Sequence, residues 1–251
     1  MEEHVYDVLN IDDWWWSRGR RALVKSLVSR YADGAQVKKV LEIGCGTGAT
    51  IEQLKPLAEI VCGLDISPAA LRYCRQRGID SICVADVSSL PYQSNEFDLV
   101  IGVDVIEHVD NDVSALREIY RVCRPGGLMI LTVPAFQFLW SRRDEQHHHK
   151  RRYTLSQFRE RVADAGFSVK RASYINMPLL LPLFLLVKVG HLLRRNPSAK
   201  MDFVLVPPPI NAMLSAVVER EAGWLRRADL PIGTSIMCVA LRPADHKGDG
   251  L

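Results

Sequence analysis

The chain has 251 residues, of which 48% are hydrophobic and 24% are charged, and these ordinary globular proportions exclude a fibrous or low-complexity chain. Its net charge of +3 is small for this length and gives no support for nucleic acid as a partner. The 6 cysteines form no Cys-x-x-Cys pair, so a structural zinc site is not expected, and reduced thiols of a cytosolic enzyme are the better interpretation.

The first elements are a helix and then a regular alternation of strands and helices. Residues 17–32 have the apolar spacing of a helix. Buried strands are expected at 38–43, 59–66, 81–86, 97–104 and 128–134, with helices at 47–57, after Pro68 and at 111–123, and with a turn at 124–127. Ser67 is positioned to cap the helix that starts at Pro68. This alternation predicts a doubly wound α/β fold with a mostly parallel sheet, because right-handed crossovers cover both of its faces.

The second half of the chain adds a helix at 154–165 and two strands, at 167–175 and 235–243, which gives seven strands. The roughly sixty residues between these two strands are too many for an ordinary connection. We therefore predict a helical insertion before the last strand. The expected organisation is an N-terminal helical lid at 1–36, an α/β core at 37–175, a helical cap at 176–232, and the last strand with a tail at 233–251.

A glycine-rich turn follows the first strand, where Gly44 and Gly46 would let the main chain approach a ligand at a helix N-terminus. Asp65 ends the second strand and could accept hydrogen bonds from a ribose, and Asp86 ends the third strand and could accept one from an adenine amino group. The same glycines also satisfy the dinucleotide fingerprint, so an NAD(P)-dependent oxidoreductase remains an alternative. Glu42 favours a sulfonium ligand with its ammonium group, because a carboxylate there would repel a pyrophosphate.

The segments VLEIGCGTG, LDIS, ADVSSLPY, FDLVIGVDVIEHV and RVCRPGGLMILTVP resemble, in order, the motifs of class I S-adenosylmethionine-dependent methyltransferases. The resemblance covers residues 38–134 and points to a bacterial subgroup similar to methyltransferase types 11 and 12. It implies a Rossmann-like methyltransferase fold, S-adenosyl-L-methionine as cofactor, and methyl transfer to oxygen or nitrogen of a small-molecule or lipid- or glycan-linked acceptor. It places the cofactor against Glu42, Gly44, Cys45, Gly46, Asp65, Ile66, Asp86, Val87, Val103 and Asp104.

A polar segment at 144–154 follows the fifth strand, at the sheet edge where ligands bind. It resembles an Asp-x-x-x-x-His-x-Arg-Arg-Tyr pattern of the subgroup, which suggests His149 as a base or acceptor ligand oriented by Asp144, with Arg152 and Tyr153 contacting an anionic acceptor. The alternative is a loop latch, in which these residues only hold their loop in place by packing it onto the cap. His108 belongs to a Glu-His pair that resembles the family's and is a second catalytic candidate, or an anchor for its loop. No metal is expected, because three consecutive histidines on a helix cannot face one ion.

Two aromatic or apolar segments complete the predicted site. Trp15 and Trp16 lie at the start of the first helix and are candidate substrate contacts, although core packing would use them equally well. The apolar run at 177–187 is shorter than the roughly 20 residues of a membrane-spanning helix, and Lys188, His191, Arg194 and Arg195 follow it. We expect a cytoplasmic protein whose cap binds a hydrophobic part of the acceptor or makes a peripheral membrane contact. A catalytically inactive cofactor-binding subunit is the non-enzymatic alternative.

Overall fold

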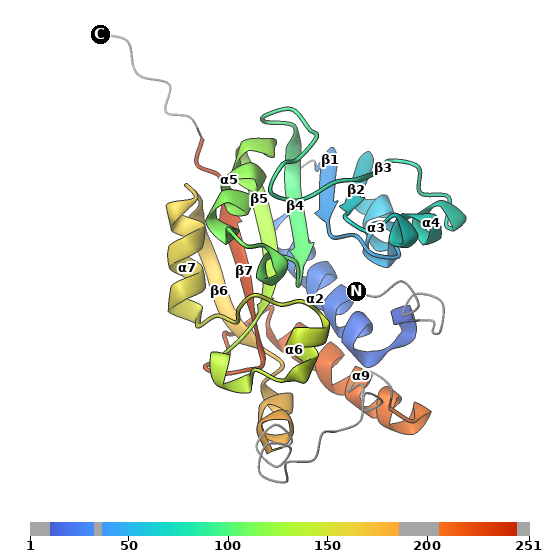
Figure 1. Cartoon of the computed structure of the whole chain (residues 1–251), viewed down its shortest axis with the longest axis vertical. Helices are drawn as coiled ribbons and strands as arrows, with labels where there is room; N and C mark the ends of the chain where they lie inside the picture. The colour runs from blue at the N-terminus through green and yellow to red at the C-terminus, as the bar shows by residue number, and fades with distance from the viewer. Residues whose placement is uncertain (1–10, 33–36, 186–205, 245–251) are drawn as a thin grey trace.

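The computed structural model describes residues 11–32, 37–185 and 206–244. Its centre is a seven-stranded sheet with the order β3-β2-β1-β4-β5-β7-β6 (Figure 1). The first five strands pair in parallel, and β7 is antiparallel to both of its neighbours. The strands are β1 (Lys39–Ile43), β2 (Ile60–Asp65), β3 (Ile82–Val84), β4 (Phe97–Val103), β5 (Cys123–Pro134), β6 (Ser168–Ile175) and β7 (Ser235–Leu241). The predicted seven-stranded, mostly parallel sheet is confirmed.

Helices connect the strands and cover the sheet. They are α2 (Trp15–Tyr31), α3 (Ala49–Leu54), α4 (Pro68–Gln76), α5 (Asp112–Val122), α6 (Arg142–Gln146), α7 (Leu155–Asp164) and α9 (Pro208–Trp224). Within the described residues, five 3-10 turns accompany them: η1 (Ile11–Asp13), η2 (Lys55–Leu57), η3 (Ile106–His108), η4 (Gln137–Leu139) and η5 (Met177–Leu179). The Ser67 hydroxyl accepts the Ala70 N–H, as expected for a cap. Thr154 and Gln157 form a capping box at the start of α7.

The core consists of apolar residues on both faces of the central strands. Leu41, Val100 and Val239 are fully buried, one from each of three strands of the sheet. Nearly continuous apolar runs of this kind are needed where helices cover both faces of a sheet. The strand predictions succeeded because these runs are bounded by glycine, proline and capping residues.

The turn predicted at 124–127 is wrong, because these residues belong to the start of β5. The pairing of β4 with β5 shifts register between Phe97 and Leu99, which accommodates the glycines. The Gly126 N–H donates to the Arg242 carbonyl, and the Arg242 N–H donates to the Gly127 carbonyl. The segment is therefore held as strand by main-chain hydrogen bonds that the sequence pattern did not reveal.

Beyond the carboxyl ends of the parallel strands lie α2, α6 and α9 (Figure 1). α2 and α9 pack on each other, with an ion pair between Arg18 and Glu219 at 2.8 Å and a hydrogen bond from Ser26 Oγ to the Ala222 carbonyl. The described helices of the N-terminal segment and of the segment before β7 thus pack together at this edge of the sheet. Lys188, His191, Arg194 and Arg195 lie outside the described residues. Within 11–32, 37–185 and 206–244, every helix is too short or too polar to cross a membrane.

Candidate functional site

The glycine turn between β1 and α3 has the left-handed conformation that glycine permits. Gly44, Gly46 and Gly48 have φ angles of +65°, +53° and +83°. A Cβ on Gly44 would lie 2.4 Å from a methyl group of Val105, whereas a Cβ on Gly46 would meet nothing within 4 Å. The turn is therefore packed on its Gly44 side and open on its Gly46 side, where a ligand can approach the main chain.

Asp65, at the end of β2, organises this turn. One carboxylate oxygen accepts the Gly46 N–H at 2.9 Å and the other accepts the Ser67 N–H at 2.9 Å. Each carboxylate oxygen has a further lone pair, so Asp65 can still accept from a ligand hydroxyl. The residue thus couples the glycine turn to the start of α4.

Glu42 lies beneath the same turn and is only 3% exposed. Its Oε2 has no hydrogen-bond partner within the described part of the chain. Burial raises the pKa of Glu42 to about 8, although hydrogen bonds from the Thr50 side chain and the Ile51 main chain oppose the shift. A buried carboxyl group with an unused oxygen fits a positively charged ligand group, which would favour its ionised form.

The next strand ends supply a second acid and an apolar surface. The Asp86 carboxylate accepts from both the side chain and the main chain of Ser88, and these bonds lower its pKa. Ile66 is 70% exposed although it is large and apolar. An exposed isoleucine between two acid-bearing strand ends fits a flat ring such as adenine. Val87 and Cys45 are buried and Val103 is half-buried.

The N-terminal segment contacts the glycine turn through Asp12, which sequence analysis missed. Asp12 in η1 accepts the Thr47 hydroxyl at 2.8 Å and pairs with Arg77, the residue that follows α4. No local pattern could have indicated Asp12, because its partners lie far along the chain.

Asp104 directly follows β4 and is held by α2. Arg20 donates to both of its carboxylate oxygens, at 2.9 and 3.1 Å, and the Thr132 hydroxyl donates to one of them at 2.9 Å. The Arg20 guanidinium also lies 4.2 Å from the centre of the Trp16 ring. Arg20 was not predicted as a site residue. Its bidentate bond ties α2 to the strand end at which the methyl-transfer site was predicted.

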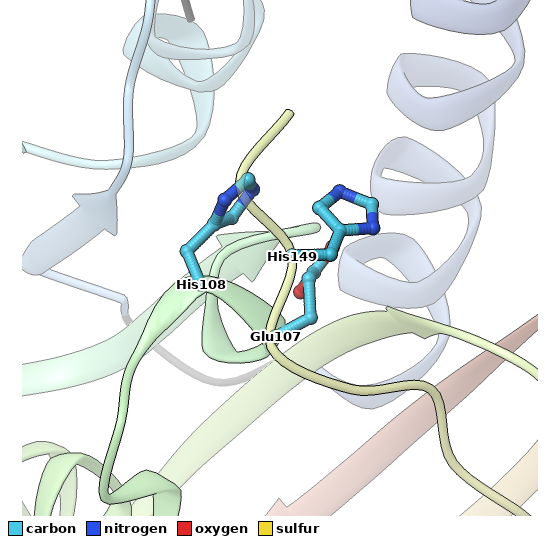
Figure 2. A group of neighbouring side chains, drawn as sticks. All are labelled: Glu107, His108 and His149. Carbon is cyan, nitrogen blue, oxygen red and sulfur yellow. The ribbon is translucent and has the colours of Figure 1, made fainter. Parts of the chain in front are cut away.

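A second cluster contains Glu107 and His108 from η3 and His149 from the loop after α6 (Figure 2). The rings of His108 and His149 meet edge to face with centres 4.7 Å apart. Glu107 is fully buried, and neither of its carboxylate oxygens has a partner among the residues described. Burial and the nearby Asp104 carboxylate raise the pKa of Glu107 well above its usual range. Burial, aided by His149, lowers the pKa of His108 to about 4, so this imidazole is neutral at pH 7.

Asp144 and His149 come together as expected, with Oδ1 and Nδ1 2.9 Å apart. Arg152 also bonds both Asp144 oxygens, at 2.7 and 2.9 Å. Burial alone would raise the pKa of Asp144, but hydrogen bonds from His149 and Arg152 bring it below its usual range. Asp144 is thus an ionised, buried anchor for the histidine.

Three residues that were expected to contact the acceptor make other contacts in the structure. The Arg152 guanidinium is occupied by Asp144 and the Ala135 carbonyl. Tyr153 is 2% exposed, and its hydroxyl donates to Asp112 at 2.9 Å. Trp15 is 3% exposed, so it is a core residue, whereas Trp16 is half-buried beside Arg20 and Arg143. For Arg152 and Tyr153 the structure favours the loop latch, because folding contacts already use their polar groups.

Comparisons with known proteins find methyltransferases. Residues 41–131 match the model of a methyltransferase domain. A Mycolicibacterium smegmatis protein described as a probable S-adenosylmethionine-dependent methyltransferase is 29% identical over 160 residues, which are 62% of this chain and 60% of that protein. This chain spans between 35% and 60% of the length of the first curated relatives it matches.

Solved structures share the fold. A chain of the complex between the Haloferax volcanii Trm112 methyltransferase activator and its methyltransferase has a TM-score of 0.60, with 20% identity and 92% of each chain covered. Haemonchus contortus phosphoethanolamine N-methyltransferase 2, in complex with S-adenosyl-L-methionine, has a TM-score of 0.56 and 18% identity, over 88% of this chain and 52% of that one.

Proposed function

This chain belongs to the class I S-adenosylmethionine-dependent methyltransferase family, and we propose that it transfers a methyl group to an oxygen or nitrogen of a small-molecule or lipid- or glycan-linked acceptor. One observation carries the proposal: the open glycine turn, the unused Glu42 oxygen, Asp65 and Asp86 follow one another along a single sheet edge. An NAD(P)-dependent enzyme would need no buried carboxyl group beneath the turn.

The residues at this edge fit S-adenosylmethionine. Glu42 would face the ammonium group, Asp65 the ribose hydroxyls, and Asp86 with Ile66 the adenine. The cofactor supplies a methyl group that its sulfonium already activates. The chain's own residues therefore need only to bind the two reactants, align them and exclude water from the site. The Arg20–Asp104 pair would fix α2 over the site and shield it from water.

His149 is the residue that we assign to the acceptor. Asp144 holds its Nδ1, which leaves Nε2 free to take a proton from an acceptor hydroxyl or amine, or to align that group. Asp144 acts as the positioning residue, and His108 lies against the His149 ring. We propose no acceptor contact for Arg152 or Tyr153.

The cap and the N-terminal helix would select the acceptor. We propose 1–36 as a lid, 37–175 with 233–251 as the core, and 176–232 as a cap. Leu181 and Leu185 are 64% and 51% exposed, and Phe138, Leu180, Leu181 and Phe184 line an apolar pocket. This surface supports a hydrophobic acceptor or a peripheral membrane contact. Flotation with neutral and anionic vesicles should show binding that the Leu181→Ser/Leu185→Ser variant loses. Absence of vesicle binding by the original chain would leave a water-soluble acceptor.

Calorimetry and label transfer test the proposed function. S-adenosylhomocysteine should bind with micromolar affinity, and NAD should not bind. With methyl-labelled S-adenosylmethionine and fractionated small molecules and lipids, label should reach an acceptor fraction, and His149→Ala should lower its rate about 10²–10⁴-fold while keeping cofactor affinity. NAD binding without a response to S-adenosylhomocysteine would refute the proposal. A fully active His149→Ala beside an inactive His108→Ala would reassign the histidine.

A further inference from the structure

Glu107, His108 and His149 form a compact group of possible metal ligands. One ligand atom from each residue lies within 4.8 Å of the others, and the side chains converge from η3 and from the loop after α6 (Figure 2). We propose that these three residues bind one divalent transition-metal ion. Two imidazoles and one carboxylate are a common ligand set for zinc, iron, cobalt and manganese.

The burial of Glu107 is the first argument. Its side chain is fully buried and both carboxylate oxygens lack a hydrogen-bond partner in the described part of the chain. A buried carboxyl group left without partners is costly to the folded state. The nearby Asp104 carboxylate increases that cost, and Arg20 and Arg152 are already bonded to other carboxylates. A cation bound between Glu107 and the imidazoles would remove the penalty.

The orientation of His149 is the second, independent argument. Its Nδ1 lies 2.9 Å from a carboxylate oxygen of fully buried Asp144, and Arg152 fixes that carboxylate in turn. A carboxylate that accepts from one ring nitrogen leaves the lone pair on the other, and metal-binding histidines are usually held in this way. The edge-to-face contact of His108 with His149 brings its ring to the same space.

Three protein ligands leave at least one coordination position open, which is typical of catalytic rather than structural metal sites. The cluster follows Asp104 directly in sequence, at the strand end where methyl transfer is proposed. The ion's role rests on that proposed function, and with the ion bound, His149 Nε2 would be a metal ligand instead of the free base. An acceptor hydroxyl would then replace a bound water and lose its proton to solvent. Its oxygen would then form the new O–CH₃ bond as the S–CH₃ bond breaks, with the electron pair staying on sulfur. The site therefore favours a hydroxyl acceptor over an amine.

Cobalt titration of the chelator-treated full chain tests the site without any turnover. We expect one Co²⁺ per chain, with visible absorption bands, and competition by Zn²⁺. Glu107→Gln and His149→Ala should weaken binding about a hundredfold. The control is His148→Asn, because His148 is an exposed neighbour outside the cluster and asparagine tolerates its φ of +57°. Thermal unfolding and S-adenosylhomocysteine affinity would verify that each variant is folded.

No saturable Co²⁺ binding by the original chain would overturn the proposal. Equal losses in His148→Asn and His149→Ala would also overturn it, because they would indicate binding to the consecutive histidines alone. Full methyl transfer by the metal-free chain would overturn the assignment of the ion to the acceptor and leave the proposed function intact. Failure to bind S-adenosylhomocysteine would count against the proposed function, while the Co²⁺ titration would still decide the metal site.

Discussion

Cofactor binding should release a proton from Glu42. Burial raises the pKa of this carboxyl group to about 8, so about nine in ten molecules carry the proton at pH 7. The ammonium group of a bound S-adenosylhomocysteine would favour the carboxylate. If the pKa in the complex falls below about 6, binding at pH 7 releases about 0.8–0.9 proton, and affinity rises by at least about tenfold from pH 6 to pH 8.

Calorimetry in two buffers measures this proton directly. At pH 7 the apparent binding enthalpy should differ between phosphate and Tris buffers. The difference should equal the number of protons released per binding event multiplied by the difference between the two buffers' ionisation enthalpies. Glu42→Gln is the matched control, because the amide keeps the shape but has no proton to release, and any titration of the ligand itself remains. The same buffer dependence in both proteins, or an affinity that is independent of pH in the original chain, would refute the reasoning.

Three further predictions concern stability, measured by urea unfolding. In the ligand-free chain, the raised pKa of Glu42 means that the free energy of unfolding falls as pH rises from about 5 to 8. The unfolding free energy of Glu42→Gln should therefore gain up to about 4 kcal/mol over that of the original chain across this range. A difference between the two proteins that stays constant with pH would contradict this. Gly46→Ala should lower the unfolding free energy by about 1 kcal/mol, because only its backbone is strained. Gly44→Ala should lower it by at least about 2 kcal/mol, because the added Cβ also clashes with Val105. Equal losses in the two variants would contradict this difference in packing. Arg20→Met should cost about 2–4 kcal/mol by leaving Asp104 without its cation, and adding Asp104→Asn should recover part of the loss; no recovery would argue against the pair.

The sheet could be predicted because its signals are local. Apolar runs, the glycine turn and the Ser67 cap each lie within a few residues, and the parallel order follows from the alternation of strands and helices. The segment at 124–127 was misread because its strand character comes from pairing with Arg242, which no neighbouring residue indicates.

The site was predicted less completely, because its contacts join distant segments. Asp12 and Arg20 reach residues 35 and 84 positions away, so neither stood out in the sequence. Tyr153 matched a family pattern, yet its hydroxyl bonds Asp112, on the helix that follows η3. The consecutive histidines were considered as a metal site only by themselves and were set aside, whereas only His149 of the three joins Glu107 and His108.

The position of β7 has a consequence for how the chain acquires its structure during synthesis. β7 lies between β5 and β6, although it is the last strand in sequence, and β6 pairs with no other strand of the described sheet. A ribosome that has made only the first 200 residues therefore holds a nascent chain in which β6 has no partner and the buried edge of β5 is open. Such an edge can pair with other chains, so chaperone binding during translation should be concentrated on β5 and end once β7 emerges.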